Sequence, residues 1–257
     1  MIIKSIKTRP FLPPKDDLEE ILAGLAHAKG SARIIKDGVI VVITSKVVAI
    51  SQGRCIRIDD SVDKYELVKK EAGEYLSKNK MPKGYSFILT IKDNILMPTA
   101  GIDESNANGH YILWPEKPFE TAKKIYNFIK KKFNLKKFGV IISDSHTTPL
   151  RWGTMGVAIG FWGFNPLKDY RGTKDIFGRK LKVTQVNLAD SLAIAAVATM
   201  GEGKEQTPIA VISDIDFIKF GNFNFLKKNP LAISRKQDIY GPILNALKWN
   251  KGGNRRN

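Results

Sequence analysis

Two uninterrupted apolar runs constrain the fold of this chain more than any other feature of its sequence. Residues 38–45 read Gly-Val-Ile-Val-Val-Ile-Thr-Ser, and residues 138–143 form a second apolar run. A continuous β-branched run of this length is typical of a strand that is buried on both faces. We therefore predict that both runs are strands in the interior of a sheet.

The other elements follow one another in no strict alternation. Extended patterns predict strands at residues 2–6, 85–91, 94–97, 111–114 and 208–213. Apolar residues at helical spacing predict helices at residues 16–28, 63–77, 118–133, 191–200 and 238–249. Asn187 and Asp190 stand at N-cap and N3 positions before the fourth helix, and residues 165–179 are predicted to form a long loop. This irregular order predicts an α+β fold with a largely mixed sheet, not a doubly wound parallel fold.

The formal net charge of +17 admits two interpretations. Such a charge favours a partner that carries many phosphates, such as nucleic acid. The basic residues are nevertheless spread along the chain, and only the tail at residues 251–257 resembles a basic arm. This distribution argues against nucleic acid as the main partner, although the charge still favours small polyanions such as nucleotides.

Cysteine content and hydropathy exclude further classes of protein. Cys55 is the only cysteine, so neither an internal disulfide nor a zinc site built from several cysteines can form. No apolar run approaches the ~20 residues that span a bilayer, and the start of the chain resembles a strand more than a signal peptide. The expected location is the cytoplasm, and no membrane partner is expected.

Three polar loops, each beside an apolar element, are candidate sites of chemistry. Their polar side chains are Asp103, Glu104 and Asn106 in residues 101–109, Asp144, Ser145 and Arg151 in residues 144–153, and Glu202, Lys204 and Glu205 in residues 201–207. Carboxylates and hydroxyls are hard oxygen ligands that suit Mg²⁺ or Mn²⁺. Metals held in this way neutralise phosphate charge during phosphoryl transfer. Each loop taken alone is more often a solvated turn.

Familiar nucleotide-binding and nucleophile motifs are absent from the sequence. Residues 201–204 read Gly-Glu-Gly-Lys, but they follow a helix and lack the spacing of a phosphate-binding P-loop. No Gly-x-Gly-x-x-Gly and no Gly-x-Ser-x-Gly occurs. The four tryptophans are most simply core or interface residues.

Several motifs occur together in an order that resembles one known family. They are Gly101-Ile-Asp-Glu-Ser-Asn106, Ile142-Ser-Asp-Ser145, Pro149-Leu-Arg151, Asp169-Tyr-Arg-Gly-Thr-Lys-Asp175, Phe177-Gly-Arg179, Ala189-Asp-Ser-Leu-Ala193 and Met200-Gly201. From about residue 2 to residue 213 the chain resembles the coenzyme F420 γ-glutamyl ligases, which add glutamate to a deazaflavin precursor. It most resembles a bacterial branch assigned to folate metabolism. The resemblance implies a ligase domain at residues 1–213 and an intertwined homodimer. Residues 214–257, which the resemblance does not cover, are predicted to form a C-terminal extension with one helix and a basic tail.

The resemblance also implies roles for individual residues. It assigns metal binding to Asp103, Asp144, Ser145 and Glu202, with Ser145 standing where a threonine is usual and Glu202 where a glutamine is usual. It assigns catalysis to Asp144, Arg151 and Arg171, with Arg179 as a further anion clamp. It assigns nucleotide binding to Phe11, Leu12, Pro13, Pro14, Ser45, Lys46, Asn106, Met200, Gly201, Glu202, Gly203, Lys204, Glu205, Gln206 and Thr207. The expected cofactors are two Mg²⁺ or Mn²⁺ ions per site, with K⁺ as a further candidate.

The implied reaction joins L-glutamate to an acceptor carboxylate through an acyl phosphate, with GTP or ATP as co-substrate. Two departures from the family pattern leave open both the nucleotide and the acceptor, a deazaflavin precursor or a folate-like molecule. Ile50 stands where a lysine is usual, and Thr148 stands where an arginine is usual. The competing interpretation is a non-catalytic basic protein that binds nucleic acid or a partner on the same fold. The acidic loops argue against it, because carboxylates repel phosphates unless metals intervene.

Overall fold

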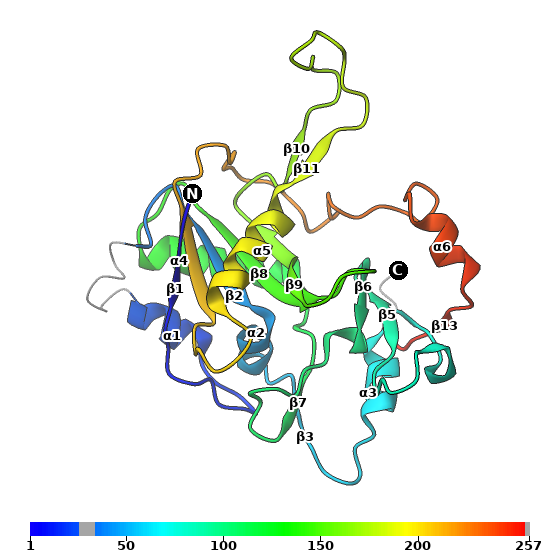
Figure 1. Cartoon of the computed structure of the whole chain (residues 1–257). Helices are drawn as coiled ribbons and strands as arrows, with labels where there is room; N and C mark the ends of the chain where they lie inside the picture. Colours follow the sequence, from blue (N-terminus) through cyan, green and yellow to red (C-terminus); the bar gives the residue numbers. More distant parts are fainter. Residues whose placement is uncertain (26–33, 255–257) are drawn as a thin grey trace.

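The computed structural model describes residues 1–25 and 34–254, and its centre is a five-stranded mixed sheet (Figure 1). The strand order is β1 (Ile2–Ile6), β12 (Ile209–Ser213), β2 (Ile40–Thr44), β8 (Gly139–His146) and β9 (Met155–Trp162). The β2–β8 pair is parallel, and the other neighbours are antiparallel. The mixed α+β fold predicted from the sequence is therefore confirmed.

The two apolar runs are the centre of this sheet, as predicted. All residues of β2 except Thr44 are buried, and so are the first five residues of β8. Helix α5 (Leu188–Met200) contacts β9, β1, β12 and β8, while α4 (Pro118–Lys132) contacts β9 and β8 from the other side of the sheet (Figure 1). Helix α1 (Leu18–Leu25) packs on α4, and α2 (Ser45–Ser51) follows β2 directly. Helices on both faces explain why these strands carry no polar alternation.

Helix α5 shows how local sequence sets an element boundary. The Asn187 side chain accepts a hydrogen bond from the backbone N–H of Asp190 at 3.0 Å, so the predicted N-cap is confirmed. The Asp190 carboxylate in turn accepts from the backbone N–H of Ala158 at 2.9 Å and ties the helix start to β9.

A smaller antiparallel sheet lies beside the main one. Its order is β13 (Asn250–Lys251), β4 (Glu74–Tyr75), β5 (Leu89–Lys92) and β6 (Ile95–Pro98). Helix α3 (Lys64–Glu71), the short 3₁₀ turns η1 (Lys78–Lys80) and η2 (Thr99–Gly101), and the ribbon of β3 (Cys55–Arg57) with β7 (His110–Ile112) complete this part of the chain. Strands β5 and β6 form a hairpin, and Asp93 and Asn94 make its turn with positive φ angles of 47° and 65°.

The C-terminal extension adds both to the core and to the smaller sheet. Phe225 is buried in the main core, and α6 (Gly241–Ala246) leads into β13, which pairs with β4. No helix among residues 1–25 and 34–254 is long and apolar enough to cross a membrane.

Tertiary pairing changes several predicted boundaries. Residues 144–146 were predicted as loop, but they extend β8 because they pair with residues 155–157 of β9. The helix predicted at 63–77 ends at Glu71, because Glu74 and Tyr75 pair with β5. The helix predicted at 238–249 is shorter, because residues 250–251 pair with β4. Residues 26–28 of the helix predicted at 16–28, and residues 255–257 of the basic tail, lie outside the described residues.

The loop predicted at residues 165–179 was also wrong in part. Strand β10 (Leu167–Asp169) pairs with β11 (Gln185–Asn187) and forms the base of a long hairpin arm that projects from the body of the molecule (Figure 1). At its end the side chains of Ile176 and Phe177 are 91% and 88% exposed. The polar side chains of residues 165–179 favoured the prediction of a loop. In the structure, residues 167–169 pair with residues 185–187 and form a two-stranded ribbon.

Candidate active site

The described residues form a pocket of about 560 Å³ where the parallel strands β2 and β8 end. Thr44 and Ser143, which pair across these strands, lie on its wall, together with the start of α2. The loop that follows η2 and the loop that follows α5 close it from two sides. The carboxyl ends of parallel strands are a common place for ligand binding, because polar side chains from separate segments converge there.

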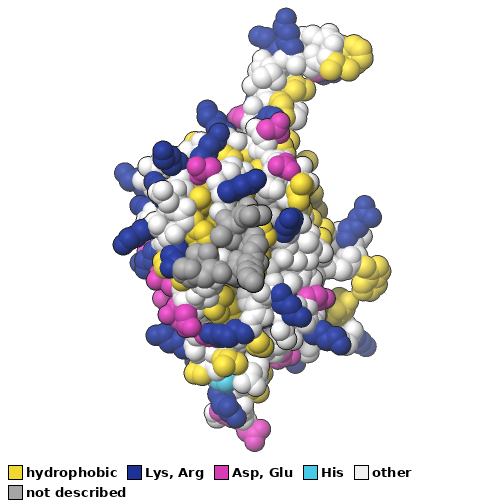
Figure 2. Space-filling model, turned by 90° about the vertical axis from the view of Figure 1, so that its left-hand side faces the viewer, with side chains coloured by type: hydrophobic (Ala, Val, Ile, Leu, Met, Phe, Trp, Pro, Cys, Tyr) yellow, Lys and Arg dark blue, Asp and Glu magenta, His cyan; other side chains and the backbone are white. Residues whose placement is uncertain are grey.

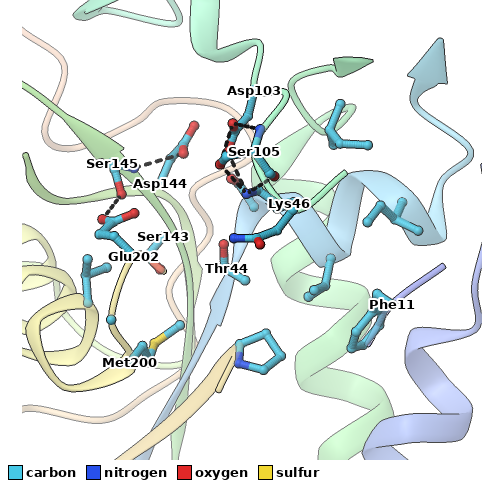
Figure 3. A pocket seen from close by; sticks show the side chains of 18 of the residues that line it. Phe11, Thr44, Lys46, Asp103, Ser105, Ser143, Asp144, Ser145, Met200 and Glu202 are labelled. Carbon is cyan, nitrogen blue, oxygen red and sulfur yellow. Dashed lines mark hydrogen bonds and ion pairs between the residues drawn. The ribbon is translucent and has the colours of Figure 1, made fainter. Parts of the chain in front are cut away.

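Two groups of polar side chains face this pocket from different elements (Figure 3). Asp103, Lys46 and Ser105 form one group, and Asp144, Ser145 and Glu202 form the other. The three polar loops singled out in the sequence thus contribute to one pocket, although β8 rather than a loop carries Asp144 and Ser145.

The first group is held by an ion pair. The Lys46 ammonium lies 2.7 Å from Asp103 Oδ2 and donates to the Ser105 carbonyl at 2.8 Å. Asp103 Oδ1 accepts from the Ser105 backbone N–H at 2.8 Å and from its hydroxyl at 2.9 Å. Burial acts to raise the pKa of Asp103, but the Lys46 charge and these hydrogen bonds outweigh it and lower the pKa.

The second group contains a carboxylate oxygen that lacks a partner. Asp144 Oδ1 accepts from the Ser145 backbone N–H at 2.8 Å, whereas Oδ2 is buried and has no hydrogen-bond partner among the described residues. Burial, with a smaller contribution from the negative charge of Asp103, raises the pKa of Asp144 to about 7. The Ser145 hydroxyl donates to Glu202 Oε1 at 2.5 Å.

The donor chemistry of this pocket fits a hard divalent cation. A buried carboxylate oxygen without a partner carries a desolvation cost that a cation would offset. The Ser143 hydroxyl oxygen is likewise buried without a partner in the described chain, on the same wall. No group of three or more His, Cys, Asp or Glu side chains within residues 1–25 and 34–254 has a metal-binding arrangement. A site here would therefore have to combine carboxylates with hydroxyls.

The lining of the pocket also includes apolar side chains. Phe11 and Met200 lie on the wall (Figure 3), and Met97 and Ile112 also line the pocket. Asn106 donates its side-chain N–H to the Gly203 carbonyl at 2.8 Å and joins the first loop to the third. A mostly apolar lining with a few polar groups is the usual form of a site for a small molecule, and it suits a ligand with a ring and a charged group.

Comparison with known proteins identifies the family. Residues 6–214 match the model of the family described as F420-0:Gamma-glutamyl ligase. A Coenzyme F420:L-glutamate ligase of Methanocaldococcus jannaschii is 36% identical over 218 residues, which cover 80% of this chain and 86% of the relative. The protein of the same name from Methanothermobacter thermautotrophicus is 31% identical over 250 residues, covering 91% and 96% of the two chains.

The chain belongs to the F420-0:γ-glutamyl ligase family. Membership makes it a ligase that forms carbon–nitrogen bonds. The family resemblance drawn from the sequence motifs is therefore confirmed, and the interpretation as a non-catalytic binding protein is not supported. On the face that Figure 2 shows, Lys and Arg side chains are scattered among other types and form no continuous stripe. The narrower resemblance to the folate-metabolism branch stays a prediction.

The structure places most residues that the γ-glutamyl ligase resemblance singled out at this pocket. Those on its wall are Phe11, Ser45, Lys46, Asp103, Asn106, Asp144, Ser145, Met200, Gly201, Glu202, Gly203, Lys204, Glu205, Gln206 and Thr207. Leu12, Pro13 and Pro14 follow Phe11 just outside the wall. Ile50, at the position where the resemblance implies a lysine, lines the pocket with an apolar side chain, and the ammonium of Lys46 on the same helix pairs with Asp103.

Arg151 and Arg171 do not line the pocket of their own chain. Arg151 lies at the exposed tip between β8 and β9, next to Trp152, whose side chain is 97% exposed. Of the two roles predicted for the tryptophans, core or interface, the core role is therefore excluded for Trp152, and the interface role stays a prediction. Arg171 lies on the hairpin arm and pairs with Asp169 at 2.5 Å, and Arg179 is also on the arm. The catalytic roles of these arginines stay predictions.

Among the pocket residues to which sequence reasoning assigned no role are Thr44, Ser105 and Ser143. Each has a hydroxyl, and two of them lie at the end of an apolar strand where the sequence turns polar. That transition is the signal that could have identified Thr44 and Ser143. Nothing in the sequence marks Ser105 as the residue that fixes both Asp103 and Lys46.

Proposed function

We propose that this γ-glutamyl ligase uses a nucleoside triphosphate to join L-glutamate, through an amide bond, to the carboxylate of a deazaflavin acceptor. The observation that carries the proposal is the buried Asp144 carboxylate, whose unpartnered Oδ2 lies on the wall of a pocket that Asp103 and Glu202 also line. The names of the relatives, Coenzyme F420:L-glutamate ligase, support glutamate as the substrate and the deazaflavin as the acceptor.

Asp103, Asp144, Ser145 and Glu202 would hold the divalent cations, and Ser143 adds a further oxygen on the same wall. Bound Mg²⁺ or Mn²⁺ supplies positive charge that screens the triphosphate and lowers the cost of charge that develops during phosphoryl transfer. The chain's own part is to bind and orient. The apolar lining with Phe11 suits the ring of GTP or ATP, and Lys46 supplies a cation near the phosphates.

The proposed reaction has two steps. An oxygen of the acceptor carboxylate attacks the γ-phosphorus, the bond to the β-phosphate oxygen breaks, and a nucleoside diphosphate leaves. The amine of L-glutamate then attacks the acyl carbon of the resulting acyl phosphate, loses a proton and displaces inorganic phosphate. No covalent enzyme intermediate is required, in agreement with the absence of a nucleophile–base pair in the described pocket.

We also propose that two copies of the chain form a homodimer through the hairpin arm. The arm carries Ile176 and Phe177 in exposed positions, and a second copy that covered them would remove this apolar surface from water. Analytical ultracentrifugation should give a dimer for the wild-type chain. A variant with Ile176→Ser and Phe177→Ser should be monomeric, and a dimer in that variant would exclude the arm as the contact.

Mass spectrometry of the products tests the proposed reaction. The chain is incubated with Mg²⁺ or Mn²⁺, L-glutamate and either GTP or ATP, and with the deazaflavin precursor or a folate as acceptor. A product heavier by one glutamyl unit, together with equal amounts of nucleoside diphosphate and phosphate, is expected with the deazaflavin. A product with folate alone would exclude the deazaflavin, and amide formation without nucleotide consumption would exclude the acyl phosphate.

A further inference from the structure

The turn that precedes Asp103 has an unusual backbone. Thr99, Ala100 and Gly101 follow one another with positive φ angles of 54°, 51° and 73°. Non-glycine residues rarely adopt this left-handed conformation, least of all a β-branched threonine. Such a turn persists only where its surroundings hold it in place, so the contacts around it show how the position of Asp103 is set.

Thr90 holds the turn from one side. Its side chain is fully buried, donates to the Met97 carbonyl at 2.7 Å and accepts from the Ala100 backbone N–H at 3.0 Å. This pair of bonds ties the turn to β5 and to the end of β6.

Trp114 holds the turn from the other side. A Cβ atom built on Gly101 would lie 2.3 Å from Cε3 of the Trp114 ring and 3.2 Å from Asp144 Oδ2. The indole ring and the unpartnered carboxylate oxygen therefore both approach the side of Gly101 on which other residues carry a side chain, and only glycine fits there. The indole ring and the Asp144 carboxylate thus meet at the side of Gly101 that has no side chain.

The indole ring is itself fixed by contacts in the smaller sheet. Trp114 is buried, its Nε1–H donates to Asp93 Oδ2 at 3.0 Å, and its carbonyl accepts from Arg54 Nε at 3.2 Å. The buried Lys92 ammonium lies 5.9 Å from the ring centroid. The ring therefore has little freedom to tilt or to shift toward the pocket.

We propose that Trp114 is a positioning residue that sets the place of the Asp103 carboxylate relative to Asp144, and with it the affinity of the pocket for divalent cations. The inference rests on the proposed metal site. Asp103 is only two residues beyond Gly101, and its backbone pairs with Ile112, two residues before Trp114, through bonds of 2.8 and 3.0 Å. A displacement of the ring would therefore move the turn and the Asp103 loop together. Residues that orient metal ligands in this way typically change metal affinity about 10–100-fold when they are replaced.

Binding of Mn²⁺ to the purified full chain tests this role without a turnover assay. Free Mn²⁺ is measured by electron paramagnetic resonance for wild type, for Trp114→Phe, and for Trp162→Phe as the matched control. Trp162 is also buried but lines no part of the pocket. We expect Trp114→Phe to bind Mn²⁺ about 10-fold more weakly, because the smaller ring leaves Gly101 unsupported and cannot bond to Asp93. Trp162→Phe should bind like wild type, even where its melting temperature falls by the same amount.

A second pair of variants tests whether the effect passes through Gly101. Gly101→Ala should weaken Mn²⁺ binding because its methyl group meets the indole ring. Adding Trp114→Leu should restore part of the affinity by making room, whereas two independent sites would give additive losses.

The outcomes separate the inference from the proposed function. Mn²⁺ affinity in Trp114→Phe within twofold of that in Trp162→Phe would overturn the positioning role while wild type still bound the ion. A wild-type chain that bound no Mn²⁺ would overturn the metal site, and the inference with it.

Discussion

Replacing Asp144 with Asn should make the metal-free protein more stable and at the same time remove its activity. An acid whose pKa is raised on folding binds its proton more strongly in the folded chain than in the unfolded chain. The stability of the metal-free protein therefore falls as pH rises from the unfolded pKa near 4 to the folded pKa of about 7. An asparagine cannot ionise, so this fall in stability between pH 4 and pH 7 should be absent from the variant.

The size of the effect follows from the shift. At about 1.4 kcal/mol per pKa unit, the shift of Asp144 corresponds to at most about 4 kcal/mol of unfolding free energy above pH 7. Water entry and small movements of the pocket reduce this to about 2 kcal/mol. For a chain of this size, about 2 kcal/mol raises the melting temperature by about 4–8 °C.

Differential scanning calorimetry from pH 4 to pH 8 in the presence of a chelator measures the effect. Ser145→Ala is the control, because it removes a proposed metal-binding hydroxyl but keeps the Asp144 carboxylate. Its stability should still fall across the window. Saturating Mn²⁺ should stabilise wild type, and turnover in Asp144→Asn should fall by ~10²-fold or more. If the melting temperatures of wild type and Asp144→Asn changed in the same way between pH 4 and pH 8, the raised pKa of the buried Asp144 carboxylate would be refuted.

Three further predictions concern charged side chains. Lys46→Met should raise the KM for the nucleotide at least ~10-fold in steady-state assays, because the variant loses the ammonium on the pocket wall; an unchanged KM would exclude phosphate contact. Lys92→Met should lower the free energy of unfolding, measured by urea denaturation, by about 3 kcal/mol, because it leaves the Glu71 carboxylate buried without one of its cations. A decrease in the free energy of unfolding below about 1 kcal/mol would contradict the stabilising role of Lys92. The hydrogen bond from Arg9 lowers the pKa of Asp16, so the stabilisation from this ion pair is present above pH 4 and is lost as pH falls through the lowered pKa. The melting temperature of Asp16→Asn should therefore be less sensitive to acid than that of wild type. Equal sensitivity would argue against a stabilising Arg9–Asp16 pair.

The secondary structure could be predicted where local sequence and tertiary structure agree. The runs that became β2 and β8, the amphipathic α4 and the N-cap of α5 were all identified because their signals lie within one element. Boundaries failed where distant pairing overrode local polarity, as at residues 144–146 and at the hairpin arm. The polar loops were recognisable as candidates, yet no local pattern could tell that they would meet in one pocket.

The sequence by itself determined the class of fold, the central strands, and the family to which the motifs belong, because these depend on periodicity and on the order of short patterns. The motifs already assigned Asp103 and Asp144 to one metal site, whereas only the tertiary structure decided that Lys46 pairs with Asp103 and that Trp114 packs against Gly101. Each of these facts joins segments far apart along the chain, and their separation in space is set by the packing of the two sheets. Burial of Asp144 and the resulting rise in its pKa likewise exist only in the folded chain, because they depend on water being excluded by residues that no local pattern connects.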